Sequence, residues 1–124
     1  MLTTPWGERL DESRILTEYP RPQMRRNSYL NLNGRWEYAI TDSDESPPRW
    51  DGTILVPFSP ESALSGVGRT LEPGQTLWYR RELTVPEGFL PRDGRLLLHF
   101  GAVDQEAAVY LNGVLLGRHM GGYN

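Results

Sequence analysis

The sequence predicts an all-β protein, and three observations lead to that fold class. The C-terminal third holds three short apolar runs, at residues 96–100, 107–111 and 114–116. The pair Asn112-Gly113 separates the last two runs, and both residues accept the positive φ angles of a two-residue hairpin turn. Two earlier segments alternate polar and apolar residues with the two-residue period of a β-strand.

Residues 1–27 are predicted to form an extended arm, followed by one β-domain over residues 28–124. The arm is polar and contains Tyr-Pro-Arg-Pro at 19–22, where proline removes a backbone donor and keeps the preceding residue extended. Only residues 11–16 support a helical turn. Three arginines of the arm could bind an anionic sugar, although solvation or ion pairing is the favoured interpretation: Arg21, Arg25 and Arg26.

Two strands are predicted in the first half of the domain. The first, at residues 35–40, has an apolar and a polar face: Trp36, Tyr38 and Ile40 against Arg35, Glu37 and Ala39. Trp36 could stack on a sugar ring, but its place in an apolar alternation favours the core. The second strand, at residues 54–56, is short and ends at Pro57.

A third strand is predicted at residues 77–85, with Tyr79 on its inner face. Trp78, Arg80 and Glu82 share the other face. An exposed tryptophan beside arginine and glutamate is typical of a sugar site. Stacking of the arginine on the indole, under a covering arm, explains the same pattern and is the favoured interpretation.

The three C-terminal apolar runs are predicted to form a meander of strands. The first two runs are apolar on both faces, which is typical of strands covered on both sides. Asp104 lies in the turn between them. There it either binds a ligand or caps the turn with its side chain, and the cap is favoured.

Composition excludes several classes of function. A net charge of −3 and a pI near 5.4 argue against nucleic acid or an anionic membrane as partner. Cysteine is absent, and two histidines without clustered carboxylates make a weak metal site, so neither a metal nor another cofactor is predicted. The N-terminus has no apolar signal region and no stretch has the length of a membrane span, so a cytoplasmic location is expected.

Several motifs are similar to those of glycoside hydrolase family 2, which holds β-galactosidases, β-glucuronidases and β-mannosidases. They occur in one order over roughly residues 19–123: Tyr-Pro-Arg-Pro at 19–22, Leu-Asn-Leu-Asn-Gly-Arg-Trp at 30–36, Leu-Trp-Tyr-Arg-Arg at 77–81, and Phe-Gly-Ala-Val-Asp, Val-Tyr-Leu-Asn-Gly and Gly-Arg-His-Met-Gly-Gly-Tyr from 100 to 123. The chain resembles the N-terminal sugar-binding domain of that family. The resemblance implies a jelly-roll β-sandwich, expected to be incomplete at the C-terminus because the chain stops just after Tyr123. It also implies immunoglobulin-like and TIM-barrel domains downstream as partners.

The patterns described above and the resemblance together suggest roles for individual residues. No catalytic residue is predicted, because both catalytic glutamates of the family lie in the barrel. The candidates for contact with a β-linked saccharide are Trp78, Arg69, Asp104 and Tyr123. Residues 57–75 form a long, turn-rich connection of the kind that is functional or disordered, and in the family it passes close to the barrel. Glu61 and Glu72 in this connection are therefore candidates for interdomain docking.

Three interpretations of function stay open at this stage. In the first, the chain is an accessory domain of a family 2 glycosidase and is inactive alone. In the second, it is a free-standing carbohydrate-binding module that uses loop aromatics such as Trp50, Trp78 or Tyr123. In the third, it is a structural sandwich without a ligand. Unpaired strand edges further predict a homo-oligomer formed by strand pairing or swapping.

Overall fold

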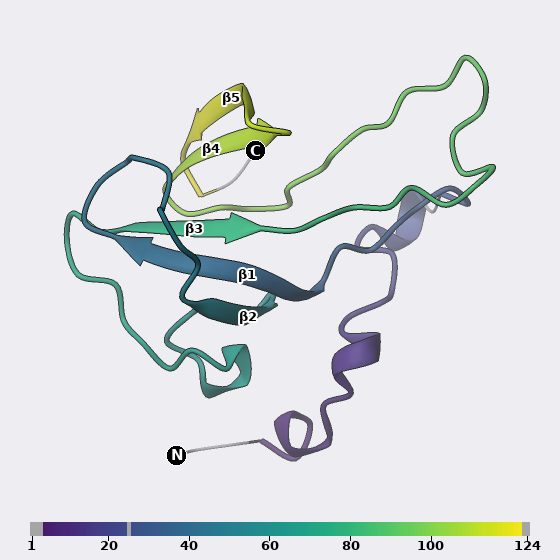
Figure 1. Cartoon of the computed structure of the whole chain (residues 1–124). Helices are drawn as coiled ribbons and strands as arrows, with labels where there is room; N and C mark the ends of the chain where they lie inside the picture. The colour runs from purple at the N-terminus through teal and green to yellow at the C-terminus, as the bar shows by residue number, and fades with distance from the viewer. Residues whose placement is uncertain (1–3, 25, 123–124) are drawn as a thin grey trace. The chain divides into compact units, whose positions relative to one another are not determined.

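A computed structural model describes residues 4–24 and 26–122, and in this part of the chain it contains five β-strands, four short 3₁₀ helices and no α-helix (Figure 1). All strand pairings are antiparallel. The predicted all-β class is therefore confirmed. The chain divides into two compact units, Met1–Thr84 and Val85–Asn124. The predicted boundary between residues 27 and 28 stays a prediction.

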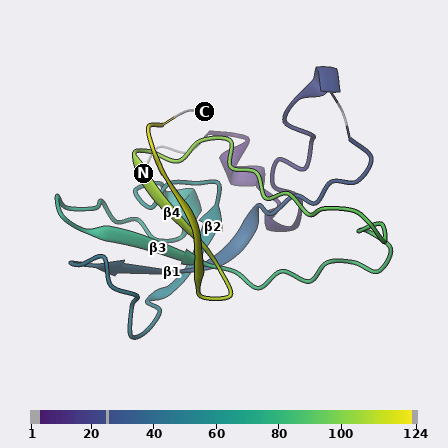
Figure 2. The same ribbon diagram turned by 90° about the horizontal axis from the view of Figure 1, so that it is seen from above.

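The first unit is built on a three-stranded antiparallel sheet in the order β2-β1-β3. Strand β1 spans Gly34–Thr41, β2 spans Gly52–Val56 and β3 spans Thr76–Arg80. The three strands lie side by side in both views of the molecule (Figure 1, Figure 2). The strands predicted at residues 35–40 and 54–56 are confirmed, each slightly longer than its apolar pattern.

Strand β3 is shorter than the predicted strand at residues 77–85. The last register pair with β1 joins Glu37 and Arg80. Beyond that pair, the guanidinium of Arg81 donates a hydrogen bond to the main-chain carbonyl of Leu32, which precedes β1 in the sequence, at a distance of 2.6 Å. A strand continues only while a neighbour supplies partners for its backbone groups, so β3 ends where the pairing with β1 ends.

The core of the first unit differs from the predicted one-sided sheet. Its buried apolar side chains are Ile15, Ala39, Ile54 and Leu55. Ala39 was expected on the solvent face, yet it is 1% exposed. Its register partner on β3 is the half-buried Trp78, and residues directly opposite on paired strands share a face. The sheet is thus apolar on both faces near Ala39, whereas Tyr79, predicted to point inward, is exposed.

The N-terminal arm forms short 3₁₀ turns and is attached to the sheet. The turns are η1 (Gly7–Arg9), η2 (Glu12–Arg14) and η3 (Pro22–Met24). The turn predicted within residues 11–16 is confirmed as η2, and the Asp11 side chain accepts from the backbone nitrogen of Ser13 at 2.9 Å. Hydrogen bonds from Ser13 hold the pKa of the Asp11 carboxyl below its usual range. The Asn31 amide donates to the carbonyl of Leu16 at 2.6 Å and so ties the arm to the chain entering β1.

The connection at residues 57–75 is organised by its own hydrogen bonds. It contains the 3₁₀ helix η4 (Ala63–Ser65), which Ser62 caps by accepting from the nitrogen of Leu64 at 3.2 Å. Ser65 is 0% exposed. Its hydroxyl donates to the carbonyl of Ser62 at 2.6 Å and accepts from the nitrogen of Val67 at 3.0 Å. The buried Ser65 hydroxyl thus orders a segment that, from its composition alone, could have been disordered.

The second unit contains the β-hairpin predicted from Asn112-Gly113. Strand β4 spans Glu106–Leu111 and β5 spans Val114–Met120 (Figure 1). Leu111 pairs with Val114 across the turn. The turn residues have φ angles of 50° and 80°, as a type I′ turn requires. The hairpin prediction is confirmed, and β5 extends beyond the apolar run at 114–116.

The strand predicted at residues 96–100 is wrong. These residues have no regular secondary structure, and the Leu97 side chain is 61% exposed. In the described part of the second unit, strand pairing is confined to β4 and β5. An apolar run becomes a strand only when another strand satisfies its backbone groups, and this pairing is not visible in the periodicity of the run. The jelly-roll architecture and the strand-mediated oligomer remain predictions.

Candidate functional site

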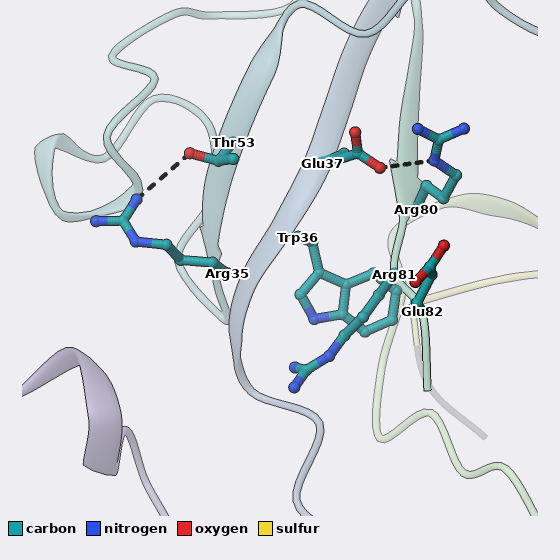
Figure 3. A pocket seen from close by; sticks show the side chains of 7 residues that line it. All are labelled: Arg35, Trp36, Glu37, Thr53, Arg80, Arg81 and Glu82. Carbon is teal, nitrogen blue, oxygen red and sulfur yellow. Dashed lines mark hydrogen bonds and ion pairs between the residues drawn. The ribbon is translucent and has the colours of Figure 1, made fainter. Parts of the chain in front are cut away.

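A surface recess of about 340 Å³ lies in the first unit where β3 leaves the sheet. Its walls come from β1, from β2 and from the chain at the end of β3 (Figure 3): Arg35, Trp36, Glu37, Thr53, Arg80, Arg81 and Glu82. An aromatic ring, three guanidinium groups and two carboxylates thus meet in one concave surface. This combination of a ring with convergent polar groups is typical of a ligand site.

A second recess, of about 560 Å³, follows the N-terminal arm. It is lined mainly by arm residues such as Trp6 and Ile15, together with Phe58 and Leu64 from the connection after β2. Asp11, one of its acidic residues, already caps η2. The second recess is larger, but the first brings the polar groups together around an aromatic ring, so we take the first as the candidate site.

Trp36 is the aromatic residue of the candidate site, and three contacts hold its ring. The indole nitrogen donates to the carbonyl of Leu32 at 2.8 Å. The ring of Tyr79 meets it edge-on, with centroids 6.4 Å apart. The Arg81 guanidinium carbon lies 5.9 Å from the ring centroid (Figure 3). The indole is therefore half-buried and held in one orientation, instead of being enclosed in the core as its alternation predicted.

Two of the three arginines in the site form ion pairs. Arg35 pairs with Glu12 of the arm at 2.5 Å and also contacts the hydroxyl of Thr53 at 3.4 Å. Arg80 pairs with Glu37 at 2.7 Å. The hydrogen bond from Arg80 lowers the pKa of the Glu37 carboxyl, and the same bond raises the pKa of Arg80.

The third arginine, Arg81, makes hydrogen bonds to the main chain. Its Nη1 group donates to the carbonyls of Leu32 and Asn33 at 2.6 and 3.0 Å. These bonds connect the end of β3 to the chain that enters β1. Within residues 4–24 and 26–122, no carboxylate forms an ion pair with Arg81.

The lowered pKa of Glu37 leads to a test by titration. The pKa of Glu37 is lower in the folded chain than in the unfolded chain. The Arg80–Glu37 ion pair therefore stabilises the fold at pH values above the unfolded pKa, and this stabilisation is lost as the pH falls through the folded pKa. Arg80→Met is expected to raise the pKa of Glu37, as measured by NMR of its side-chain carboxyl. Arg92→Met, in the second unit, serves as a control and should leave it unchanged. An unchanged Glu37 pKa in Arg80→Met would contradict the assigned cause.

Two of the predicted aromatic candidates, Trp50 and Trp78, do not line the recess. Trp78 does not line it, and its indole nitrogen donates to the hydroxyl of Thr41 at 2.9 Å. The guanidinium of Arg80 lies over the ring of Trp50, 4.4 Å from the centroid, and not over Trp78 as predicted. The reason is that Trp50 reaches this face from the loop between β1 and β2. Tyr123 lies outside the described residues.

The predicted charged candidates are exposed, and those of the first unit do not line the recess. Glu61, Arg69 and Glu72 belong to the connection between β2 and β3, and none of them lines either recess. Tyr79 is 41% exposed, and the partial burial of its side chain, followed by the charge of Glu61, raises its pKa. Asp104 precedes β4 in the second unit and is exposed. The structure therefore does not bring the candidates of the first unit, Trp78, Arg69, Glu61 and Glu72, into this site.

Sequence reasoning missed Arg81, Glu37 and Thr53 as site residues. The available signal was the pair Arg80-Arg81 after two aromatic residues, but alternation placed Arg81 on the inner face. No group of acidic residues and histidines in the described chain is arranged to hold a metal. Of the helices the structure describes, none combines the length and hydrophobicity that crossing a bilayer requires.

Comparison with known proteins finds similarity to two β-glucuronidases. The chain is 30% identical over 107 residues to a β-glucuronidase of Streptococcus agalactiae, covering 85% of this chain and 17% of that protein. It is 29% identical over 119 residues to a β-glucuronidase of Felis catus, covering 85% of this chain and 18% of that protein. The predicted resemblance to family 2 glycoside hydrolases is confirmed. The chain spans less than a fifth of the length of these glycosidases, and no family model matches it.

Proposed function

We propose that the chain is a non-catalytic, sugar-binding part of a family 2 β-glycosidase. In this role it supports hydrolysis of β-glycosidic bonds by a catalytic TIM barrel in another part of the enzyme. The observation that carries the proposal is the similarity to two β-glucuronidases over 85% of this chain but only 17% and 18% of theirs. A β-glucuronide is accordingly the first substrate class to test.

The chemistry of the candidate site supports binding instead of catalysis. A retaining glycosidase needs two carboxyl groups about 5–5.5 Å apart, one of them protonated to act as the acid. Glu37 accepts a hydrogen bond from Arg80, which lowers its pKa and so favours its ionised form. A carboxyl held in this way is unsuited to donate a proton. Immunoglobulin-like and barrel domains as partners, and the jelly-roll fold, belong to the same proposal.

The proposal is tested by titrating the isolated chain with β-linked saccharides and assaying hydrolysis of 4-nitrophenyl β-glycosides. All four tryptophans of the sequence lie in the first unit, and one of them, Trp36, lines the site. We expect saturable changes in tryptophan fluorescence and no hydrolysis. An α-linked saccharide serves as the control ligand.

Two results would contradict the proposal in different ways. Hydrolysis by the 124-residue chain, free of contaminating enzyme, would contradict the non-catalytic role. A chain shown to be folded by circular dichroism, yet binding no saccharide, would contradict the sugar-binding role. The family relationship would stand in either case, because it rests on sequence.

A further inference from the structure

We propose that the hairpin turn at Asn112-Gly113 is a site of spontaneous covalent modification, in which the asparagine deamidates through a cyclic imide formed with Gly113. The chain contains two Asn-Gly pairs, this one and Asn33-Gly34. The first lies in the exposed turn between β4 and β5, and the second lies where the chain enters β1. The fold leaves the first pair open to the reaction and protects the second.

The reaction requires only water and the two residues of the turn. The Gly113 nitrogen gives its proton to hydroxide and forms a bond to Cγ of Asn112. The bond between Cγ and Nδ2 then breaks, and the side-chain nitrogen takes a proton from water and leaves as ammonia. Water afterwards opens the imide at one of its two carbonyls. Opening at Cγ gives aspartate, whereas opening at the main-chain carbonyl gives isoaspartate, in which the chain continues through Cγ.

The reacting atoms of the turn are accessible to solvent. Both residues are exposed, and a Cβ atom placed on Gly113 would meet no heavy atom within 4 Å apart from its chain neighbours. In the part of the chain that the structure describes, neither the Asn112 side chain nor the Gly113 nitrogen makes a hydrogen bond. Hydroxide can therefore reach the nitrogen, and no hydrogen bond has to break before Cγ is attacked.

Hydrogen bonds hold the other Asn-Gly pair. Asn33 is half-buried, and its Nδ2 donates to the carbonyl of Ile15 at 3.3 Å. Its backbone nitrogen donates to Oδ1 of Asn31 at 2.7 Å, and its carbonyl accepts from Arg81 at 3.0 Å. Attack on the Asn33 side chain requires this arrangement to open. Releasing two such bonds is expected to slow the reaction at Asn33 about tenfold relative to Asn112.

The two products are expected to affect the hairpin differently. Aspartate leaves the backbone unchanged, and a type I′ turn accepts Asp-Gly as it accepts Asn-Gly. Isoaspartate inserts an additional carbon into a two-residue connection, whose length and turn type set the register of the strands. Because a hairpin of two strands is marginally stable on its own, the pairing of Leu111 with Val114 is expected to be lost in the isoaspartyl chain.

The experiment follows both asparagines in the whole chain during incubation at mildly alkaline pH. Trypsin places them in different peptides, 27–35 and 96–118, in which tandem mass spectrometry locates the conversion of the amide into an acid. We expect Asn112 to react about tenfold faster than Asn33 in the folded chain. In concentrated urea, which unfolds the chain, the two rates should become similar, because each asparagine precedes a glycine.

Two variants test the role of the turn. Asn112→Gly removes the reacting amide and leaves Gly-Gly, which a type I′ turn accepts, so modification of peptide 96–118 should cease while β4 and β5 stay paired. Asn112→Asp reproduces one product and should also keep the hairpin. Hydrogen exchange of the β4 and β5 amides measures the pairing. Exchange should be accelerated in the isoaspartyl chain, separated by chromatography, and in neither variant.

The contrary outcomes are equally specific. A rate at Asn112 in the folded chain no higher than that at Asn33 would overturn the proposal. A rate difference of the same size in urea would also overturn it, because the flanking sequence and not the fold would then be the cause. An isoaspartyl chain with unchanged exchange in β4 and β5 would overturn the expected effect on the hairpin. These measurements involve no saccharide, so the proposed function is tested separately.

Discussion

Leu55→Ala is expected to lower the free energy of unfolding of the first unit by about 2–5 kcal/mol, the usual cost of removing a buried leucine side chain. Leu55 is 3% exposed and is, with Ile15, Ala39 and Ile54, one of the residues of the buried hydrophobic core in the described chain. Because this core is small, few other contacts can compensate for the loss of the Leu55 side chain. Because small domains are stable by only about 5–15 kcal/mol, a loss of this size takes much of the total.

The measurement is urea unfolding followed by tryptophan fluorescence. All four tryptophans lie within Met1–Thr84, so the signal reports on the unit that contains Leu55. Leu83→Ala is the matched control, because it removes the same atoms from a side chain that is 44% exposed. The control should cost less than about 1 kcal/mol. Equal unfolding midpoints for the two variants would contradict the assigned core.

Ser65→Ala is expected to destabilise the first unit by about 1–3 kcal/mol, the cost of leaving a buried polar group without its partner. The Ser65 hydroxyl is the hydrogen-bond partner of the Val67 nitrogen and the Ser62 carbonyl, and the residue is 0% exposed. Alanine removes a single oxygen, so packing changes little and the effect reports on hydrogen bonding.

Ser59→Ala provides the control for this substitution. Ser59 is an exposed residue of the same connection, so its hydroxyl can bond to water in the folded and unfolded chain alike. Unfolding in urea should distinguish the two variants clearly. In addition, hydrogen exchange at the Val67 amide should accelerate in Ser65→Ala alone. If both variants unfold at the midpoint of the natural chain, the connection is not ordered by the Ser65 hydroxyl.

The Nη1 group of Arg81 donates to the carbonyls of Leu32 and Asn33 and so connects two segments that are distant in sequence. A substitution at this position is therefore expected to change the stability of the first unit.

The sequence by itself determined the features that depend on local patterns. Alternation located the strands around Trp36 and Ile54, and the positive φ angles that Asn112 and Gly113 accept located the hairpin. The helical turn expected within residues 11–16 corresponds to η2. The ordered motifs indicated the family resemblance. Each of these features depends on neighbouring residues along the chain, and periodicity and backbone preference are visible there.

Only the tertiary structure decided the features that depend on pairing between distant segments. Residues 96–100 have a strand-like composition but no partner strand within the described unit, and β3 stops at Arg80 because its register with β1 stops there. Ala39 is buried because its partner across the sheet is Trp78. In the same way, folding pairs Arg80 with Glu37 and leaves Arg81 without a carboxylate partner among the residues that the structure describes. Identical side chains adjacent in sequence thus acquire different chemistry, because their partners come from distant parts of the chain.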